Sequence, residues 1–234
     1  MQTFWLQIFV LFYALFLSFL HYFFEKLSSR VGSFHDILLS FGAGTLLSTI
    51  FLILLPEAVH SSPTLIVYPL ILVGYVVFLI LEKYLYQHVK DPVLLEEELY
   101  HLHAGGFFAD HFIKGFILVA IVELEPILGF LTAIPFLIHT LSSSIALKEI
   151  HSVSERALDR VLLSAAPLVG ALVGLLMDIG PNMERYFLAF VSGLMLFLVS
   201  RDIMPKEKEG RPLFFLLGLF VIFLIWLGLA LLIP

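Results

Sequence analysis

Two long apolar stretches of this 234-residue chain each carry side chains that can bind a cation or a proton. The first contains Asp110, His111 and Lys114, and the second contains His139 followed by three serines that include Ser143. Residues four apart share one face of an α-helix, so Asp110 and Lys114 are expected to form an ion pair. Ionisable side chains in a membrane cost at least ~2.5 kcal/mol, so those that persist usually face a bundle interior and mark a pathway or a paired site.

The composition places these stretches in a membrane. Hydrophobic residues make up 60% of the chain and charged residues 14%, and the mean hydropathy is +1.03. Soluble domains are roughly 45–50% apolar and about 25% charged. The lack of cysteine excludes disulfides and thiolate metal ligands, and a net charge of -6 offers no basic surface for nucleic acid.

Eight apolar runs are long enough to cross a lipid bilayer as helices, which takes roughly 20 residues each. They are too long and too evenly apolar for the strands of a membrane barrel. The predicted fold class is an all-α polytopic membrane protein, with residues 1–234 forming a single domain of eight transmembrane helices. The runs are Thr3 to Phe24, Phe34 to Leu55, Pro63 to Tyr86, Gly106 to Glu123, Ile127 to Lys148, Arg160 to Asp178, Arg185 to Met204 and Pro212 to Ile233.

The distribution of Lys and Arg predicts the orientation in the membrane. Eleven of the thirteen basic residues fall in the odd-numbered connections, whereas the even-numbered ones hold only Arg185. Connections rich in Lys and Arg are retained on the cytoplasmic side of a membrane, so the odd-numbered connections are expected there. Both termini are then expected on the outer side. The longest connection, residues 87–105, is then cytoplasmic and holds three histidines and the acidic run Glu96 to Glu98. We expect a multi-pass protein of the plasma membrane, and its oligomeric state, monomer or homodimer, stays open.

The two polar stretches are expected to meet near the middle of the membrane. The helix of Lys114 runs outward and that of His139 runs inward, which brings both residues to a similar depth. Pro135, one turn before His139, removes a backbone hydrogen bond and frees a carbonyl group. Such a cluster has two readings. It can be a structural ion pair with a histidine hydrogen-bonded to Ser143, or it can be a functional site.

Three stretches of the sequence resemble ZIP (Zrt/Irt-like) divalent metal transporters. FGAGTLLSTIFLILLPEA (Phe41 to Ala58), VGYVVFLILEKYL (Val73 to Leu85) and FLAFVSGLMLFLVSRDIMP (Phe187 to Pro205) are similar to the second, third and seventh helices of that family. The resemblance implies a ZIP-like bundle that transports zinc, iron or manganese toward the cytoplasm. It implies no prosthetic group, because the divalent cation is the cargo.

The match departs from the family pattern at the metal-site helices. The family carries His-Asn-x-x-Asp-Gly, or a Glu variant, on helix four, and aligning its glycine on Gly115 makes Lys114 replace a carboxylate. On helix five, His139 matches the histidine of His-Glu-x-x-x-Glu, but Thr140 and Ser143 replace its glutamates. The seventh-helix pattern Asp-x-x-Pro-Glu keeps its aspartate as Asp202.

The resemblance assigns roles residue by residue. The metal ligands it implies are Asp110, His111 and His139, and the residues along the transport pathway are Lys114, Ser143, Thr140, Glu57 and Asp202. Glu57 would attract cations at the outer mouth, and Asp202 would release them at the inner mouth. Zinc and related cations favour about four ligands, and a protonated Lys114 repels them. A weaker metal site, a proton-linked variant and a non-transporting relative therefore all stay open.

Two alternatives to transport use the same residues. The chain can be a structural or regulatory membrane protein, or an intramembrane peptidase in which Glu96 and Glu97 act with His111 and His139. The peptidase pattern Glu-Glu-x-x-x-Arg lacks its arginine here, and it requires Glu97 to reach both histidines in a shared cavity. We expect a transporter and not an enzyme.

The charge asymmetry predicts that a reporter fused after Lys90 lies on the cytoplasmic side of the membrane. A reporter fused after Pro234 is expected on the opposite side. Paired fusions active on either side of the membrane measure this. An external reporter after Lys90 contradicts the orientation.

Overall fold

The computed structural model describes residues 2–27, 34–60, 63–124, 126–150, 157–177, 181–203 and 210–232. Within these ranges every regular element is helical, as the evenly apolar runs predict. The elements are α1 (Gln2–Leu27), α2 (Phe34–Thr49), the π-helical η2 (Ile50–Leu54), α3 (Leu55–Val59), α4 (Thr64–His88), α5 (Pro92–Leu124), α6 (Pro126–Ile150), α7 (Ala157–Leu176), α8 (Pro181–Leu198), the π-helical η3 (Val199–Ile203) and α9 (Pro212–Leu232).

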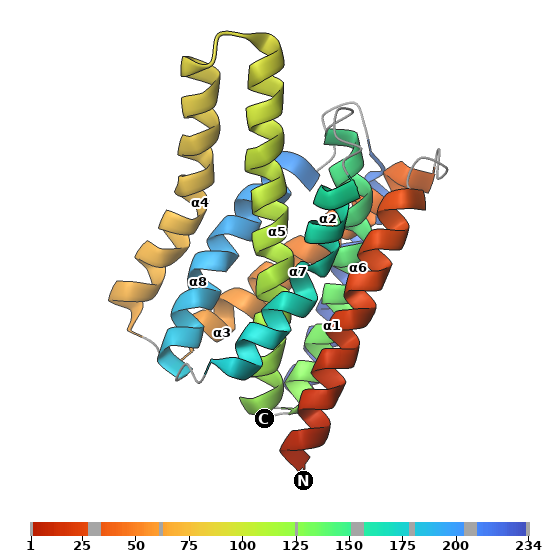
Figure 1. The fold of residues 1–234 in the computed structure, drawn as a ribbon. Helices are drawn as coiled ribbons and strands as arrows, with labels where there is room; N and C mark the ends of the chain where they lie inside the picture. Colours follow the sequence, from red (N-terminus) through yellow and green to blue (C-terminus); the bar gives the residue numbers. More distant parts are fainter. Residues whose placement is uncertain are drawn as a thin grey trace.

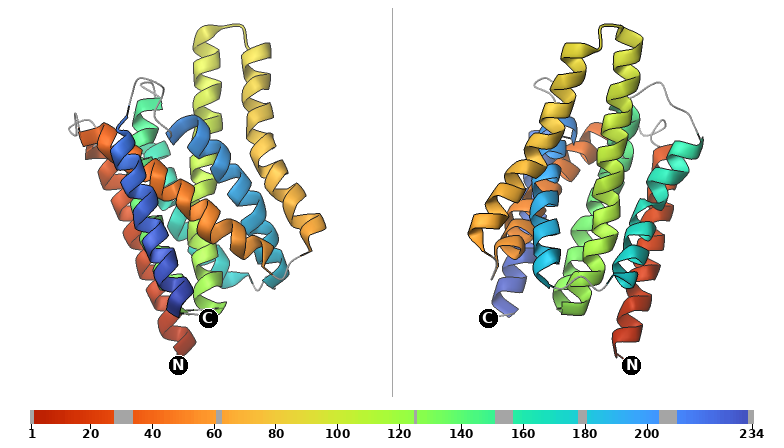
Figure 2. Two further views of the ribbon diagram at one scale, coloured as in Figure 1. Left: turned by 180° about the vertical axis from the view of Figure 1, so that it is seen from behind. Right: turned by 60° about the vertical axis from the view of Figure 1, so that its left-hand side comes forward.

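These described elements form eight helical rods, because α2, η2 and α3 follow one another without a break, as do α8 and η3. Successive rods run in alternating directions (Figure 1). The two ends of the chain lie at one end of the bundle, and the turn between α4 and α5 lies at the other (Figures 1 and 2). Both termini therefore lie on the same side of the bundle.

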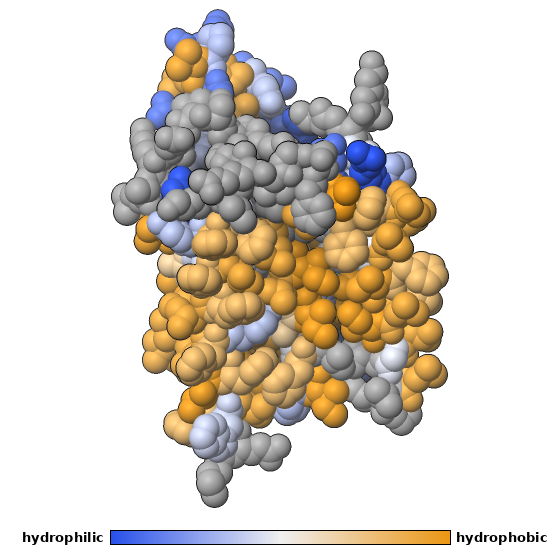
Figure 3. Space-filling view, turned by 90° about the vertical axis from the view of Figure 1, so that its right-hand side faces the viewer, coloured by the Kyte–Doolittle hydropathy of each residue, from blue (hydrophilic) through white to orange (hydrophobic). Residues whose placement is uncertain are grey.

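Five helical stretches are long and apolar enough to cross a membrane, as in a multi-pass membrane protein. They are Phe4–Phe24, Asp36–Val59, Leu65–His88, Pro92–Val122 and Asn182–Arg201, and three shorter apolar stretches are Thr132–Leu141, Arg160–Leu176 and Pro212–Gly228. Large apolar side chains point outward, with Phe12, Leu65 and Leu176 at least 70% exposed. Figure 3 shows an apolar belt around the middle of one face, with polar residues gathered toward one end. Such a surface suits lipid and not water.

The predicted start of a helix at Gly106 is wrong, since most of the connection predicted over residues 87–105 is itself helical. Only residues 89–91 separate α4 from α5. The Asp91 carboxylate accepts hydrogen bonds from the backbone N–H groups of Val93 (2.9 Å) and Leu94 (3.2 Å), as the N-cap of a helix does. Pro92 suits the first helical position. The hydropathy pattern shows where the sequence becomes polar, but it does not show where a helix ends. α4 and α5 both continue into the polar residues and form a helical hairpin (Figure 1).

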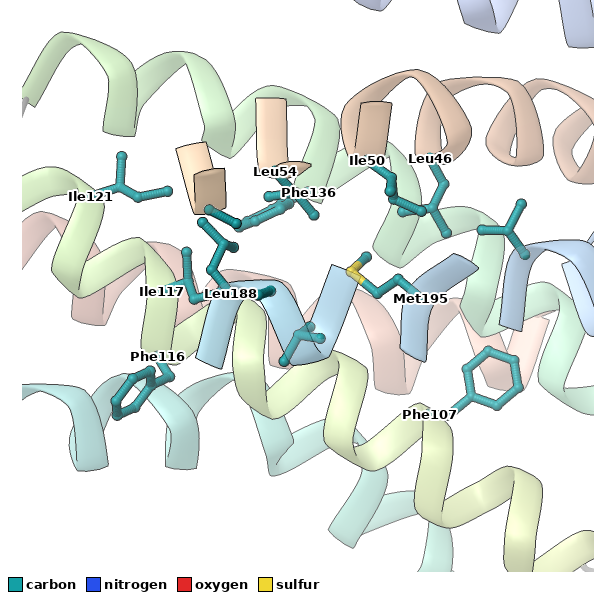
Figure 4. Close-up of a cluster of buried hydrophobic side chains, with 14 of the residues drawn as sticks. Leu46, Ile50, Leu54, Phe107, Phe116, Ile117, Ile121, Phe136, Leu188 and Met195 are labelled. Atoms are coloured by element: carbon teal, nitrogen blue, oxygen red, sulfur yellow. The ribbon is translucent and has the colours of Figure 1, made fainter. Parts of the chain in front are cut away.

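The rods pack as two groups of four. The first helix group contains α1, α5, α6 and α7, and its apolar core includes Val10, Leu118 and Ala171. The second helix group contains α2 with η2 and α3, α4, α8 with η3, and α9. Apolar side chains fill the space between the groups, including Ile50 of η2 and Phe136 of α6 (Figure 4). The two groups therefore meet across a largely apolar interface.

Three helix pairs approach so closely that glycine is needed at their crossings. A Cβ atom on Gly115 would lie 1.9 Å from the Pro167 carbonyl oxygen, and one on Gly170 would lie 1.8 Å from that of Phe112. The same reciprocal arrangement joins α4 to α8 through Gly74 and Gly193, and α2 to α9 through Gly44 and Gly218. Small residues permit the close backbone packing that holds helices together in lipid.

Replacing one of these glycines is expected to destabilise the protein. Gly170→Ala puts a methyl group against a backbone carbonyl, so we expect a loss of about 1–3 kcal/mol from overpacking. Gly105→Ala is the matched control, because a Cβ atom there meets nothing within 4 Å. Thermal unfolding in detergent measures both variants. Equal stability of the two variants contradicts the close packing of α5 and α7.

Candidate functional site

A cluster of buried polar side chains lies inside the first helix group, where α5 packs against α6. Asp110, His111 and Lys114 come from α5, and His139 comes from α6. All four residues are at most 1% exposed. The predicted meeting of the two polar stretches is confirmed.

One carboxylate oxygen is the centre of this cluster. Lys114 Nζ donates to Asp110 Oδ2, which confirms the predicted ion pair. His139 Nε2 lies 2.9 Å from the same oxygen, and His111 Nδ1 lies 3.3 Å from it. Charge-assisted hydrogen bonds of this kind are about twice as strong as neutral ones, and a low local dielectric strengthens them further. The contacts therefore fix α5 and α6 relative to each other.

The hydrogen-bond partners of both histidines define which ring nitrogen carries a proton. An ionised carboxylate only accepts, so His139 donates from Nε2 to Asp110. The Phe107 carbonyl also only accepts, so His111 donates to it from Nδ1 over 2.8 Å. In a neutral imidazole the other nitrogen then carries a lone pair. Metal-ligating histidines are usually held in this way, by a carboxylate or a backbone carbonyl on the far nitrogen.

Three polar atoms of the cluster have no hydrogen-bond partner in the described part of the chain. They are Asp110 Oδ1, His139 Nδ1 and Thr140 Oγ1. Buried polar atoms are nearly always paired, so these atoms mark a place suited to a small polar ligand or a water. Lys114 occupies the other carboxylate oxygen. Among the described residues, no three His, Cys, Asp or Glu side chains are arranged to hold a metal ion.

The predicted pathway residues of α6 lie in the cluster, with one correction. The structural reading pairs Ser143 with His139, but the Ser143 Oγ lies 3.2 Å from His111 Nε2 instead. The Thr140 carbonyl also lies 3.2 Å from Ser143 Oγ and accepts a hydrogen bond from Ser144. Serine hydroxyls commonly bond to a carbonyl one turn back in a helix. Ser143 therefore connects the backbone of α6 to the imidazole of His111.

The structure adds His21 of α1, which sequence reasoning did not include. This residue is fully buried, and its ring centroid lies 4.5 Å from that of His111 at an interplanar angle of 89°. The ring of His111 lies 6.1 Å from that of His139, so His111 contacts the imidazole of α1 and lies near that of α6. His21 is the only histidine, and there is no Asp, Glu, Lys or Arg, within the first apolar run, which was the signal that could have identified it.

The two predicted pathway residues at the mouths lie away from this cluster. Glu57 belongs to α3, and its Oε1 lies 3.9 Å from Nε of Arg185, which offsets its charge. Asp202 belongs to η3, and its side chain is outside the described residues. Seventeen helical residues separate Arg185 from Asp202, a rise of about 25 Å. Glu57 and Asp202 therefore lie toward opposite ends of the bundle.

Glu97, the residue on which the peptidase reading depends, lies far from the two histidines in the described part of the chain. Glu97 is half exposed and lies 4.0 Å from His101, near the hairpin turn. It precedes His111 by fourteen residues on the continuous helix α5, a distance of about 21 Å. Glu97 therefore does not share a cavity with His111 or His139.

A further ionic contact, which sequence reasoning missed, lies in the second helix group. Arg201 of η3 donates from Nε (2.9 Å) and Nη2 (2.6 Å) to Oε1 of Glu82, a buried residue of α4. Glu82 lies in an apolar run, and its partner is 119 residues away in the sequence. This contact holds η3 against α4.

Removing one partner of the Asp110–Lys114 pair is expected to cost more than removing both charges. Lys114→Met leaves a buried carboxylate without its cation, so we expect a loss of about 3–5 kcal/mol. Asp110→Asn in the same chain removes the remaining charge and is expected to restore much of that stability. Unfolding of the two single variants and the double variant completes the cycle. Additive effects would contradict a coupled pair.

Neither a protein-family model nor a curated protein sequence matches the chain. The chemistry of the polar cluster and the packing of its helices are therefore the basis on which a function can be assigned.

Proposed function

We propose that this protein is a ZIP-like carrier that moves a divalent cation, such as zinc, iron or manganese, toward the cytoplasm. The proposal rests above all on the state of two histidines. His139 and His111 are each anchored through one N–H, to Asp110 and to the Phe107 carbonyl. Each neutral ring then presents a lone pair on its other nitrogen, as metal-ligating histidines do.

Lys114 acts in this mechanism as an internal counter-ion. Its ammonium neutralises Asp110 when the site holds no cation. A divalent cation must displace that ammonium, because two positive charges a few ångströms apart repel strongly in a low dielectric. The flexible four-carbon stem of lysine allows the ammonium to move aside. Ligation by Asp110 breaks its hydrogen bond to His139, so the His139 and His111 rings must rotate to bring their lone-pair nitrogens to the same cation.

The two helix groups supply the moving parts of the carrier. The cluster lies inside the first helix group, and an apolar interface separates that group from the second. Rocking of one group against the other exposes a central site alternately to the two sides, as in many secondary carriers. In this proposal all eight rods span the plasma membrane and both termini face outward. Glu57 then lies at the outer mouth and Asp202 at the inner mouth.

A non-transporting role is the second candidate, and one observation favours it. Lys114 already satisfies the charge of Asp110, and the described residues contain no ready group of three metal ligands. In that case the cluster serves as a structural lock between α5 and α6.

Reversing the charge of the side chain at position 114 distinguishes the carrier from the structural lock. Lys114→Glu puts a second carboxylate beside Asp110, and a bound divalent cation relieves the repulsion between the two negative charges. We therefore expect zinc or manganese to bind at least about tenfold tighter than in the wild type. Lys83→Glu is the matched control, because it makes the same charge change at an exposed position of α4. Calorimetric titration at one pH measures binding, and uptake of the same ions into proteoliposomes measures transport by the wild type.

The structural-lock candidate predicts the opposite results. Under it, Lys114→Glu binds cations no better than Lys83→Glu, and wild-type proteoliposomes take up no more ion than empty vesicles. Those results together would remove transport as the function.

A further inference from the structure

We infer that His21 of α1 is a fourth ligand of the cation, so that the site selects zinc and other imidazole-preferring cations over manganese. This inference rests on the proposed function and narrows its substrate class.

The position of His21 provides the first argument. Its ring meets that of His111 edge to face, with ring centroids 4.5 Å apart, and both residues are fully buried. An imidazole within an apolar helix is costly in a membrane unless it faces polar partners in the bundle interior. His21 faces the polar cluster and not the lipid.

The packing of α1 provides the second argument, because it holds His21 in place. The Tyr13 hydroxyl, two turns before His21, donates a hydrogen bond to the Ala133 carbonyl of α6. Val10 and Ala14 of α1 pack into the apolar core of the first helix group. A ligand carried on a packed helix is positioned more accurately than one on a loop. These contacts fix α1 against the two helices that carry the other candidate ligands.

The donor set provides the third argument. Asp110, His111 and His139 offer three ligands, which is one fewer than the usual four of a zinc site. Adding His21 gives three imidazole nitrogens and one carboxylate oxygen. Imidazole suits zinc, copper, nickel and iron(II), whereas manganese prefers oxygen ligands. A nitrogen-rich set of this kind therefore favours zinc over manganese.

Lys114 explains why the four groups are not gathered around one point in this structure. Its ammonium contacts Asp110 Oδ2, the oxygen that lies nearest both His139 and His111. When that ammonium moves aside, the carboxylate and the lone-pair nitrogens can converge on a cation by side-chain rotation. His21 lies beside the ring of His111, so it approaches the cation from α1.

The test compares two cations in matched variants. Zinc and manganese are titrated into four proteins: the wild type, His21→Ala, His21→Gln and Ser18→Ala. The same four proteins are then tested again with Lys114→Glu added to each. Ser18 is the control, because it is a buried polar residue one turn away on the same helix. His21→Gln keeps a polar side chain of similar size, so it guards against loss of folding. We expect both His21 variants to weaken zinc binding at least about tenfold and manganese binding much less.

X-ray absorption of bound zinc counts its histidine ligands directly. We expect three histidines in the wild type and in Ser18→Ala, and two in His21→Ala. Unchanged zinc affinity and an unchanged histidine count in both His21 variants would overturn the assignment of His21 and leave the carrier proposal standing. Failure of every chain, including those with Lys114→Glu, to bind either cation would overturn both.

Discussion

The cost of leaving the Asp110 carboxylate uncompensated inside an apolar bundle governs the first helix group. This carboxylate is buried away from the surface, so side chains from the same bundle must offset its charge. Lys114 meets it from the same helix, and His139 meets it from α6. His139 can do so only if α6 packs against α5 at this depth. One charge therefore sets the register of two helices and the orientation of their polar side chains.

Close packing at glycines and ion pairs both stabilise the individual helix groups. The three reciprocal glycine crossings all join helices within one group: α5 to α7, α4 to α8, and α2 to α9. The two ionic contacts described above at the buried residues Asp110 and Glu82 also lie within one group each. The interface between the groups is largely apolar instead. These close backbone crossings and ionic contacts are thus internal to each group.

The spacing of residues along the helices predicted the contacts between residues that are close in the sequence. The four-residue separation of Asp110 and Lys114 gave their ion pair, and opposite helix directions brought His139 to the same depth. His21 was missed because its relation to His111 depends on how α1 packs, which no spacing encodes. The Glu82–Arg201 contact spans 119 residues and was missed for the same reason. The start of α5 was misplaced because hydropathy reports the membrane boundary and not the end of a helix.

The short turn between α4 and α5 restricts how the two helix groups can move. α4 belongs to the second group and α5 to the first, and only residues 89–91 join them. Such a link spans at most about 14 Å. α5 is about 50 Å long, while the hydrocarbon core is about 30 Å thick, so the link lies well outside the hydrocarbon. α7 and α8 also belong to different groups, and only four residues separate Leu176 of α7 from Pro181 of α8, at the end of the bundle where the two termini lie (Figure 1). The groups are thus joined by short links at both ends, and neither end is left free to separate widely.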